Sequence, residues 1–228
     1  MKTTLVAVGL ALSFFAATLG SLLEGEATPS ELMPLNTKLD HFEVSDGILR
    51  DGISALSLEH IQGLHLGFEE LIRDRIQDNP RAQGNHFSVR LDNVTVKEVL
   101  DRLCTLDDRY TWSQDGATIN VYPLLTVDNP SYLFNLFIQK IGVKNIPDPD
   151  QALTPLSRLL PQQQIGYFGA GLGSNAYAKP WTTTFEHLTV RQYVNRLSEH
   201  MGGETSWVWQ GGKGERMFTF VKDGFHTR

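Results

Sequence analysis

The chain has 228 residues, 41% of them hydrophobic and 20% charged, which is the composition of an ordinary globular protein of one or two domains. Its formal net charge is −6, and the absence of a basic run argues against nucleic acid and anionic lipid as electrostatic partners. The single cysteine, Cys104, excludes an internal disulfide framework, and we expect it to be a small core or boundary residue.

Residues 1–27 have the layout of a secretory signal peptide. Lys2 supplies positive charge, an almost wholly apolar run covers residues 5–23, and small residues near Gly20 and Ala27 offer cleavage sites. Because the apolar run approaches the ~20 residues that span a bilayer, an uncleaved N-terminal membrane anchor is the alternative. Both interpretations predict an exported chain in the periplasm or cell envelope, with membrane contact only through this segment.

Residues 28–38 contain two prolines and scattered polar residues, which is typical of a linker. Alternating apolar residues after the linker predict a strand, and the Ser-Asp-Gly of residues 45–47 offers caps for a helix. Apolar residues at helical spacing follow, and Gly63 stands where a glycine commonly ends a helix. The predicted order is strand 39–44, helix 49–61, strand 64–68 and a polar loop over 73–84.

The stretch from Phe87 to Tyr122 carries the clearest local signals. Apolar and polar residues alternate over 87–92, which predicts a half-buried strand. Thr95 and Glu98 then have the spacing of a capping box, and the helix after them has one apolar face. Two β-prone runs, 110–113 and 118–122, flank a Gln-Asp-Gly turn and predict a hairpin.

The pattern restarts after Pro123, with weaker signals. Asp148 and Pro149 make a good helix start, but Pro155 predicts that this helix is short or kinked. The remaining expected elements are one or two strand segments within 133–143, a Gly-rich loop over 165–179, a strand over 181–185, a helix over 189–201, and a hairpin with strands from Trp207 and over 217–221.

The two halves align at one constant offset across a strand end, a helix cap and an apolar helix face. Thr95 aligns with Thr189, Glu98 with Gln192, and the apolar positions after them also correspond. A slightly longer connection then brings Trp112 onto Trp209. The sequence therefore predicts an α+β fold made of two small βαββαβ-type sandwich units in tandem, each with two helices packed on short sheets. The expected domains are 39–124 and a second, divergent unit at 125–228.

The first unit resembles a known domain family. The run from Phe42 to Pro123, with Val-Ser-Asp-Gly at 44–47, Leu-His-Leu-Gly-Phe at 64–68 and the strand–helix stretch 87–100, is similar to the secretin and TonB short N-terminal (STN) domain. The resemblance covers 39–124 most clearly, and a divergent second copy is expected at 133–225. It implies a periplasmic fold that contacts other proteins in secretion channels or signalling receptors. The sequence to Arg228 gives no support for a channel or barrel segment.

No catalytic, cofactor or metal motif stands out. His60, His65 and His200 do not have the spacing that puts two metal ligands on one helix face, so we predict no metal site. The glycines of 166–174 lack the strand–helix context and the Lys-Ser/Thr pair of a phosphate loop, so we predict no bound cofactor. The cap and turn positions of most aspartates explain them without acid–base chemistry.

Aromatic residues in the second half are the candidate partner-binding residues. The Gly-rich loop carries aromatic side chains, and alternate positions of the last hairpin place two tryptophans on one side of a strand. Two explanations are open for these tryptophans: core packing, or an exposed face that binds a partner or a glycan. The candidates are Tyr167, Phe168, Tyr177, Trp207 and Trp209.

We therefore expect an exported, non-enzymatic protein-interaction module, accessory to secretion or to envelope signalling, with another envelope protein as its partner. A strand edge is an expected binding surface, since small αβ sandwiches offer strand addition. The alternative is a small-ligand or glycan-binding protein, or an enzyme, with its site between the two units.

Overall fold

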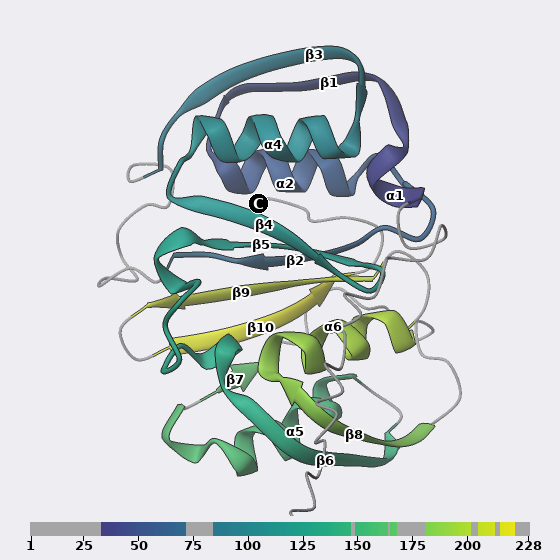
Figure 1. The fold of residues 1–228 in the computed structure, drawn as a ribbon, viewed down its shortest axis with the longest axis vertical. Helices are drawn as coiled ribbons and strands as arrows, with labels where there is room; N and C mark the ends of the chain where they lie inside the picture. The colour runs from purple at the N-terminus through teal and green to yellow at the C-terminus, as the bar shows by residue number, and fades with distance from the viewer. Residues whose placement is uncertain are drawn as a thin grey trace, which may run out of the picture.

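The computed structural model describes residues 33–71, 84–146, 149–163, 165–167, 181–201, 205–212 and 215–221. They form five layers (Figure 1): a two-stranded ladder, a helix pair, a central sheet, a second helix pair and a second two-stranded ladder. The fold is thus α+β, as predicted. The predicted signal peptide or anchor at 1–27 lies outside the described residues. None of the described helices is long and apolar enough to cross a membrane.

The first half contains the strands and helices that the sequence predicts, with different boundaries. It also has a short helix at Met33–Asn36, inside the predicted linker 28–38, because Leu35 packs into the core of this half. In chain order they are α1 (Met33–Asn36), β1 (Lys38–Gly47), α2 (Leu49–Ser57), β2 (His65–Glu69), β3 (Phe87–Thr95), α4 (Val96–Leu106), β4 (Tyr110–Asp115) and β5 (Thr118–Pro123).

The predicted capping box begins α4. The Thr95 hydroxyl accepts a hydrogen bond from the Glu98 amide at 3.2 Å, and the Glu98 carboxylate accepts one from the Thr95 amide at 2.8 Å. These backbone and side-chain hydrogen bonds lower the pKa of Glu98. Two of the amides at the helix start that lack a partner within the helix are thereby satisfied, which is why a short signal in the sequence placed this helix correctly.

The start of α2 was predicted less well, because β1, the strand before it, is longer than expected. β1 continues through residues 45–47, so these do not cap α2. The N-cap is Ile48, whose amide donates to the carboxylate of Asp51 at 3.0 Å. α2 also ends at Ser57 instead of residue 61, and His60 has a left-handed φ of 48° in the connection to β2.

The second half repeats the same order of elements. They are β6 (Phe137–Ile146), α5 (Pro149–Leu159), β7 (Gly166–Tyr167), β8 (Trp181–Thr189), α6 (Val190–Met201), β9 (Ser206–Gly212) and β10 (Glu215–Val221). Short 3-10 turns lie at Leu124–Thr126 (η1), Leu133–Asn135 (η2) and Pro161–Gln163 (η3). Pro155 lies inside the single short helix α5, as its position predicted. The β-α-β-β-α-β-β order therefore occurs twice.

Local irregularities of the two ladders also correspond. β1 pairs with β3 and β6 with β8, both antiparallel, with register shifts between Val44 and Gly47 and between Val143 and Ile146. At each shift a left-handed residue donates its amide to a hydroxyl on the partner strand: Asp46 to Ser88, and Asn145 to Thr182.

One continuous sheet joins the halves. Its strand order is β4-β5-β2-β9-β10-β7, so three strands from each half lie side by side. Within each half the hairpin is antiparallel and the remaining strand is parallel to its neighbour. Strands of both halves share this sheet. The division into two domains at residue 125 stays a prediction.

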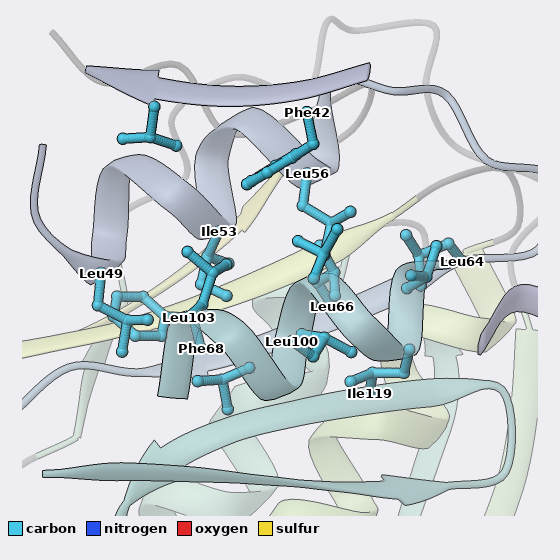
Figure 2. Close-up of a cluster of buried hydrophobic side chains, with 14 of the residues drawn as sticks. Phe42, Leu49, Ile53, Leu56, Leu64, Leu66, Phe68, Leu100, Leu103 and Ile119 are labelled. Atoms are coloured by element: carbon cyan, nitrogen blue, oxygen red, sulfur yellow. The ribbon is translucent and has the colours of Figure 1, made fainter. Parts of the chain in front are cut away.

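Each helix pair packs its own hydrophobic core against the sheet. Figure 2 shows the first core, in which side chains of α2 and α4 meet side chains of β1, β2 and β5. Ile53, Leu56, Leu100 and Leu103 are at most 1% exposed, and each such side chain contributes roughly 1.5–3 kcal/mol on burial. A second core lies between α5, α6 and the other end of the sheet, and its centre is Phe134, Tyr193, Trp207, Trp209 and Phe218.

Candidate functional site

The seam between the halves is a parallel strand pair. β2 pairs with β9 in the register Gly67–Trp207, Phe68–Val208 and Glu69–Trp209, and the carbonyl of Trp209 accepts from the amide of Glu70 at 2.9 Å. A Cβ at Gly67 would lie 2.5 Å from the indole of Trp207, so only glycine fits here. The second half thus adds a strand to a sheet edge of the first half.

A buried ion pair secures this seam. Glu69, fully buried on β2, meets Arg191, 15% exposed on α6, with Nε–Oε1 and Nη2–Oε2 distances of 2.5 and 3.1 Å. Arg191 also donates to Asn135 Oδ1 at 3.1 Å, and its guanidinium lies 4.3 Å from the ring centre of Tyr122. Burial raises the pKa of Glu69, and the charge of Arg191 opposes that rise. The pair therefore holds α6 against the first half. Loss of either partner would leave the other charge buried and uncompensated, which is energetically costly.

A second polar contact joins α6 to the tip of the first hairpin. Asn195 donates to Asp115 at 2.9 Å and accepts from the indole N–H of Trp207 at 3.0 Å. The carboxylate of Glu199 accepts from the Ala117 amide and from the Thr118 hydroxyl, both at 3.2 Å. These contacts lie at the junction where the alternative expectation places a ligand site, and that alternative stays a prediction.

β4 has the same place in the first half as β9 has in the second. Both strands pair with the next strand in the chain in matching antiparallel registers, Asp115–Thr118 and Gly212–Glu215. The outer side of β9 pairs with β2, whereas β4 pairs with no described strand except β5. β4 is therefore an open edge at the position where its counterpart has accepted a strand.

The alternation of hydrogen bonds along β4 shows which backbone N–H and C=O groups lie at this open edge. The Leu124 amide donates to the Arg109 carbonyl at 2.8 Å, so residue 109 faces β5. Alternation along an antiparallel strand then turns the N–H and C=O of Trp112 away from β5, toward the open edge. The counterpart residue Trp209 points its carbonyl toward β2 in the same way. The backbone of Trp112 is thus aimed at an incoming strand.

Exposed apolar side chains flank the open edge. η1 follows β5 and contacts β4, and its Leu124 and Leu125 are 53% and 70% exposed, with Val127 next at 44%. We call Leu124, Leu125 and Val127 the η1 patch. Apolar residues grouped in this way mark contact surfaces more often than scattered ones do.

The structure places the predicted partner-binding residues differently. Trp207 and Trp209 are 0% and 1% exposed and pack on Phe134 and Phe218, so they belong to the core and offer no surface to a partner. Tyr167 lies in β7. Phe168 and Tyr177 lie outside the described residues. Of the two explanations that the sequence leaves open for the tryptophans, core packing is therefore the one the structure supports, because Phe134 and Phe218 cover them.

The reactive groups considered in the sequence have ordinary surroundings. Burial raises the pKa of the half-buried Cys104 thiol to about 12, which makes it a poor nucleophile. His65 is hydrogen-bonded to the Thr205 carbonyl at 2.7 Å, and His200 lies against Trp181. In the ranges that the structure describes, no three His, Cys, Asp or Glu residues are grouped as metal ligands.

A shallow hollow beside β2 and β4 carries charged groups that are already paired. Arg50 lies 3.7 Å from Glu70, and the guanidinium of Arg109 makes two bonds to the carboxylate of Asp107, at 2.6 and 2.7 Å. These pairs leave little charge for a ligand to neutralise.

Sequence reasoning missed the seam and the open edge, although one signal was present. Leu66-Gly67-Phe68 of β2 matches Ile165-Gly166-Tyr167 at β7, and both glycines pair with equivalent hairpin positions, Asn120 and Met217. Comparison with known proteins adds no guide, since no protein-family model matches the chain and neither a curated protein nor a solved structure is detectably similar to it.

Proposed function

We propose that this chain is a non-enzymatic protein-interaction module of the cell envelope, which binds an extended strand of its partner at the β4 edge. The observation that carries the proposal is inside the molecule: β9, the counterpart of β4, pairs with β2 on the side that β4 leaves open. An open edge supplies main-chain hydrogen bonds for affinity, and neighbouring side chains supply specificity.

Two features support β4 over the other strand edges. The η1 patch lies next to it and would be removed from water by a bound partner. The backbone of Trp112 also faces outward in the middle of a six-residue strand, which is long enough to pair with a partner segment. The layout of residues 1–27 and the resemblance of 39–124 to STN domains support the envelope and the protein partner.

The test is capture of partners from an envelope fraction with three forms of the chain. Trp112→Pro removes the outward N–H, and an edge strand tolerates proline at such a position. Trp112→Ala is the matched control, since it also loses the indole and its hydrogen bond to Asp101 but keeps the N–H. We expect wild type and Trp112→Ala to retain the same protein and Trp112→Pro to lose it. Equal capture by Trp112→Pro would refute strand addition at β4.

A further inference from the structure

The seam inside the chain has two different sides, and each half carries a copy of both. The first half contributes the β2 edge and the tip of its hairpin, and the second half contributes the β9 edge and one face of α6. The counterpart of the β9 side is therefore left over on the first half, and the counterpart of the β2 edge is left over on the second.

The leftover β2-type edge is β7. Gly67 pairs with Asn120 and Phe68 with Val121, while Gly166 pairs with Met217 and Tyr167 with Phe218, both in parallel. Among the described strands, β7 also ends the six-stranded sheet, as β2 would end the sheet of the first half without β9. Gly166 thus occupies the place of Gly67, the glycine over which the Trp207 indole packs.

The leftover α6-type face is on α4. Arg191, Asn195 and Arg196 are three of the α6 residues that contact the first half, and Asn195 is fully buried there. Their counterparts on α4, in the alignment set by the two capping boxes, are Lys97, Asp101 and Arg102. All three counterparts are exposed.

Apolar residues beside the β9 and β4 edges differ in exposure in the same way, since those beside β9 are buried and those beside β4 are more exposed. Trp209 is 1% exposed, whereas its counterpart Trp112 is half-buried. Val221 packs against the core of the first half, whereas its counterpart Leu124 is 53% exposed. The first half therefore keeps, uncovered, the surface that the second half buries in the seam.

We propose that the β4 edge of one copy pairs with the β7 edge of a second copy, head to tail, and so repeats the internal β2–β9 seam between molecules. This inference rests on the proposed function of the β4 edge and names its occupant. The internal register places Gly166 opposite Tyr110 of the neighbour and Tyr167 opposite Thr111, with the strands parallel.

The contact joins two different edges, so each added copy leaves one free edge of each kind. Association of this heterologous type does not close on itself as a two-fold dimer does. The contact lacks the buried ion pair, because Phe168 stands in the sequence where Glu69 stands in the first half. We therefore expect reversible, concentration-dependent association.

Disulfide trapping between two single variants tests the register. Neighbouring strands lie about 4.8 Å apart, within the Cα separation of a disulfide. Purified Thr111→Cys and Tyr167→Cys chains are mixed under mild oxidation, and the linked peptides are identified by mass spectrometry. We expect a 111–167 linkage, which in a mixture of single variants must join two molecules. Gln114→Cys in place of Thr111→Cys is the out-of-register control, and its linkage should form at least about tenfold more slowly.

Sedimentation of the wild-type chain accompanies the trapping, and its mean mass is expected to rise past that of a dimer with concentration. A 111–111 linkage would show a two-fold contact between β4 edges and overturn the inference. Equal trapping of the out-of-register pair, or a constant monomer mass, would also overturn it. If these results contradict head-to-tail pairing while Trp112→Pro still abolishes partner capture, the proposed function stands and only the second copy as partner is refuted.

Discussion

Removal of the Arg191 guanidinium is the sharpest perturbation of the seam. Arg191→Ala leaves the carboxylate of Glu69 fully buried, without the cation that bonds it at 2.5 and 3.1 Å. Loss of one partner of a buried ion pair typically destabilises a protein by about 3–5 kcal/mol, because the remaining charge is uncompensated. The variant also loses the stacking of the guanidinium on Tyr122.

Lys97→Ala is the matched control, because Lys97 holds the same place on α4. Its ammonium lies 2.6 Å from the carboxylate of Asp101, but the two side chains are 55% and 48% exposed. An exposed i,i+4 pair contributes only about 0.3–0.5 kcal/mol. The two variants should therefore differ by several kcal/mol in the free energy of unfolding.

Urea denaturation at several pH values measures both changes. The pKa of Glu69 is already raised by burial, and removal of Arg191 raises it further. When the pKa of a carboxyl is raised in the folded state, the protein loses stability as the pH rises through that folded pKa. The deficit of Arg191→Ala should thus be large at neutral pH and shrink on acidification. A loss below about 1 kcal/mol, or one equal to that of Lys97→Ala, would refute the assigned role of the pair.

Two further substitutions and one titration test local features. Thr95→Ala removes the helix cap and should lower the free energy of unfolding by about 1 kcal/mol in urea denaturation, with an unchanged value as the contrary result. Gly67→Ala should destabilise by about 1–3 kcal/mol, since its Cβ would lie 2.5 Å from the Trp207 indole; Gly142→Ala, with 3.9 Å to its nearest neighbour, should change little, and equal effects would contradict this. His41 should titrate above 6.5 by NMR, because hydrogen bonds to the neighbouring carboxylates raise its pKa. Its contribution to stability is therefore present at low pH and lost as the pH rises through the folded pKa. A pKa below 6.5 would contradict these bonds.

The elements predicted well are those whose signals are local. The capping box at Thr95 needs only residues three positions apart, and the structure contains both of its hydrogen bonds. The end of α2 was predicted less well, since apolar spacing continues through Ile61 although the helix stops at Ser57. Helix boundaries of this kind depend on packing that the spacing of side chains does not encode.

The seam could not be predicted, because its partners are far apart in the chain. Nothing near Glu69 in the sequence indicates that it meets Arg191, and the alternation of Trp207 and Trp209 is the same for an exposed face as for a core face. The pairing of β2 with β9 joins the halves in which Glu69 and Arg191 lie, and Phe134 and Phe218 cover the two tryptophans. The repeated Gly67 and Gly166 were the available signal, but only the strand order shows that one edge is filled and the other is not.

The backbone amide of Trp112 reports directly on the β4 edge. Its hydrogen exchange is measured by NMR in the free chain and after binding of the partner protein recovered by capture. The amide should exchange rapidly when β4 is open, as expected for an unpaired strand group, and slowly once an incoming strand accepts its hydrogen bond. Binding that leaves the exchange of Trp112 unchanged would contradict strand addition at β4.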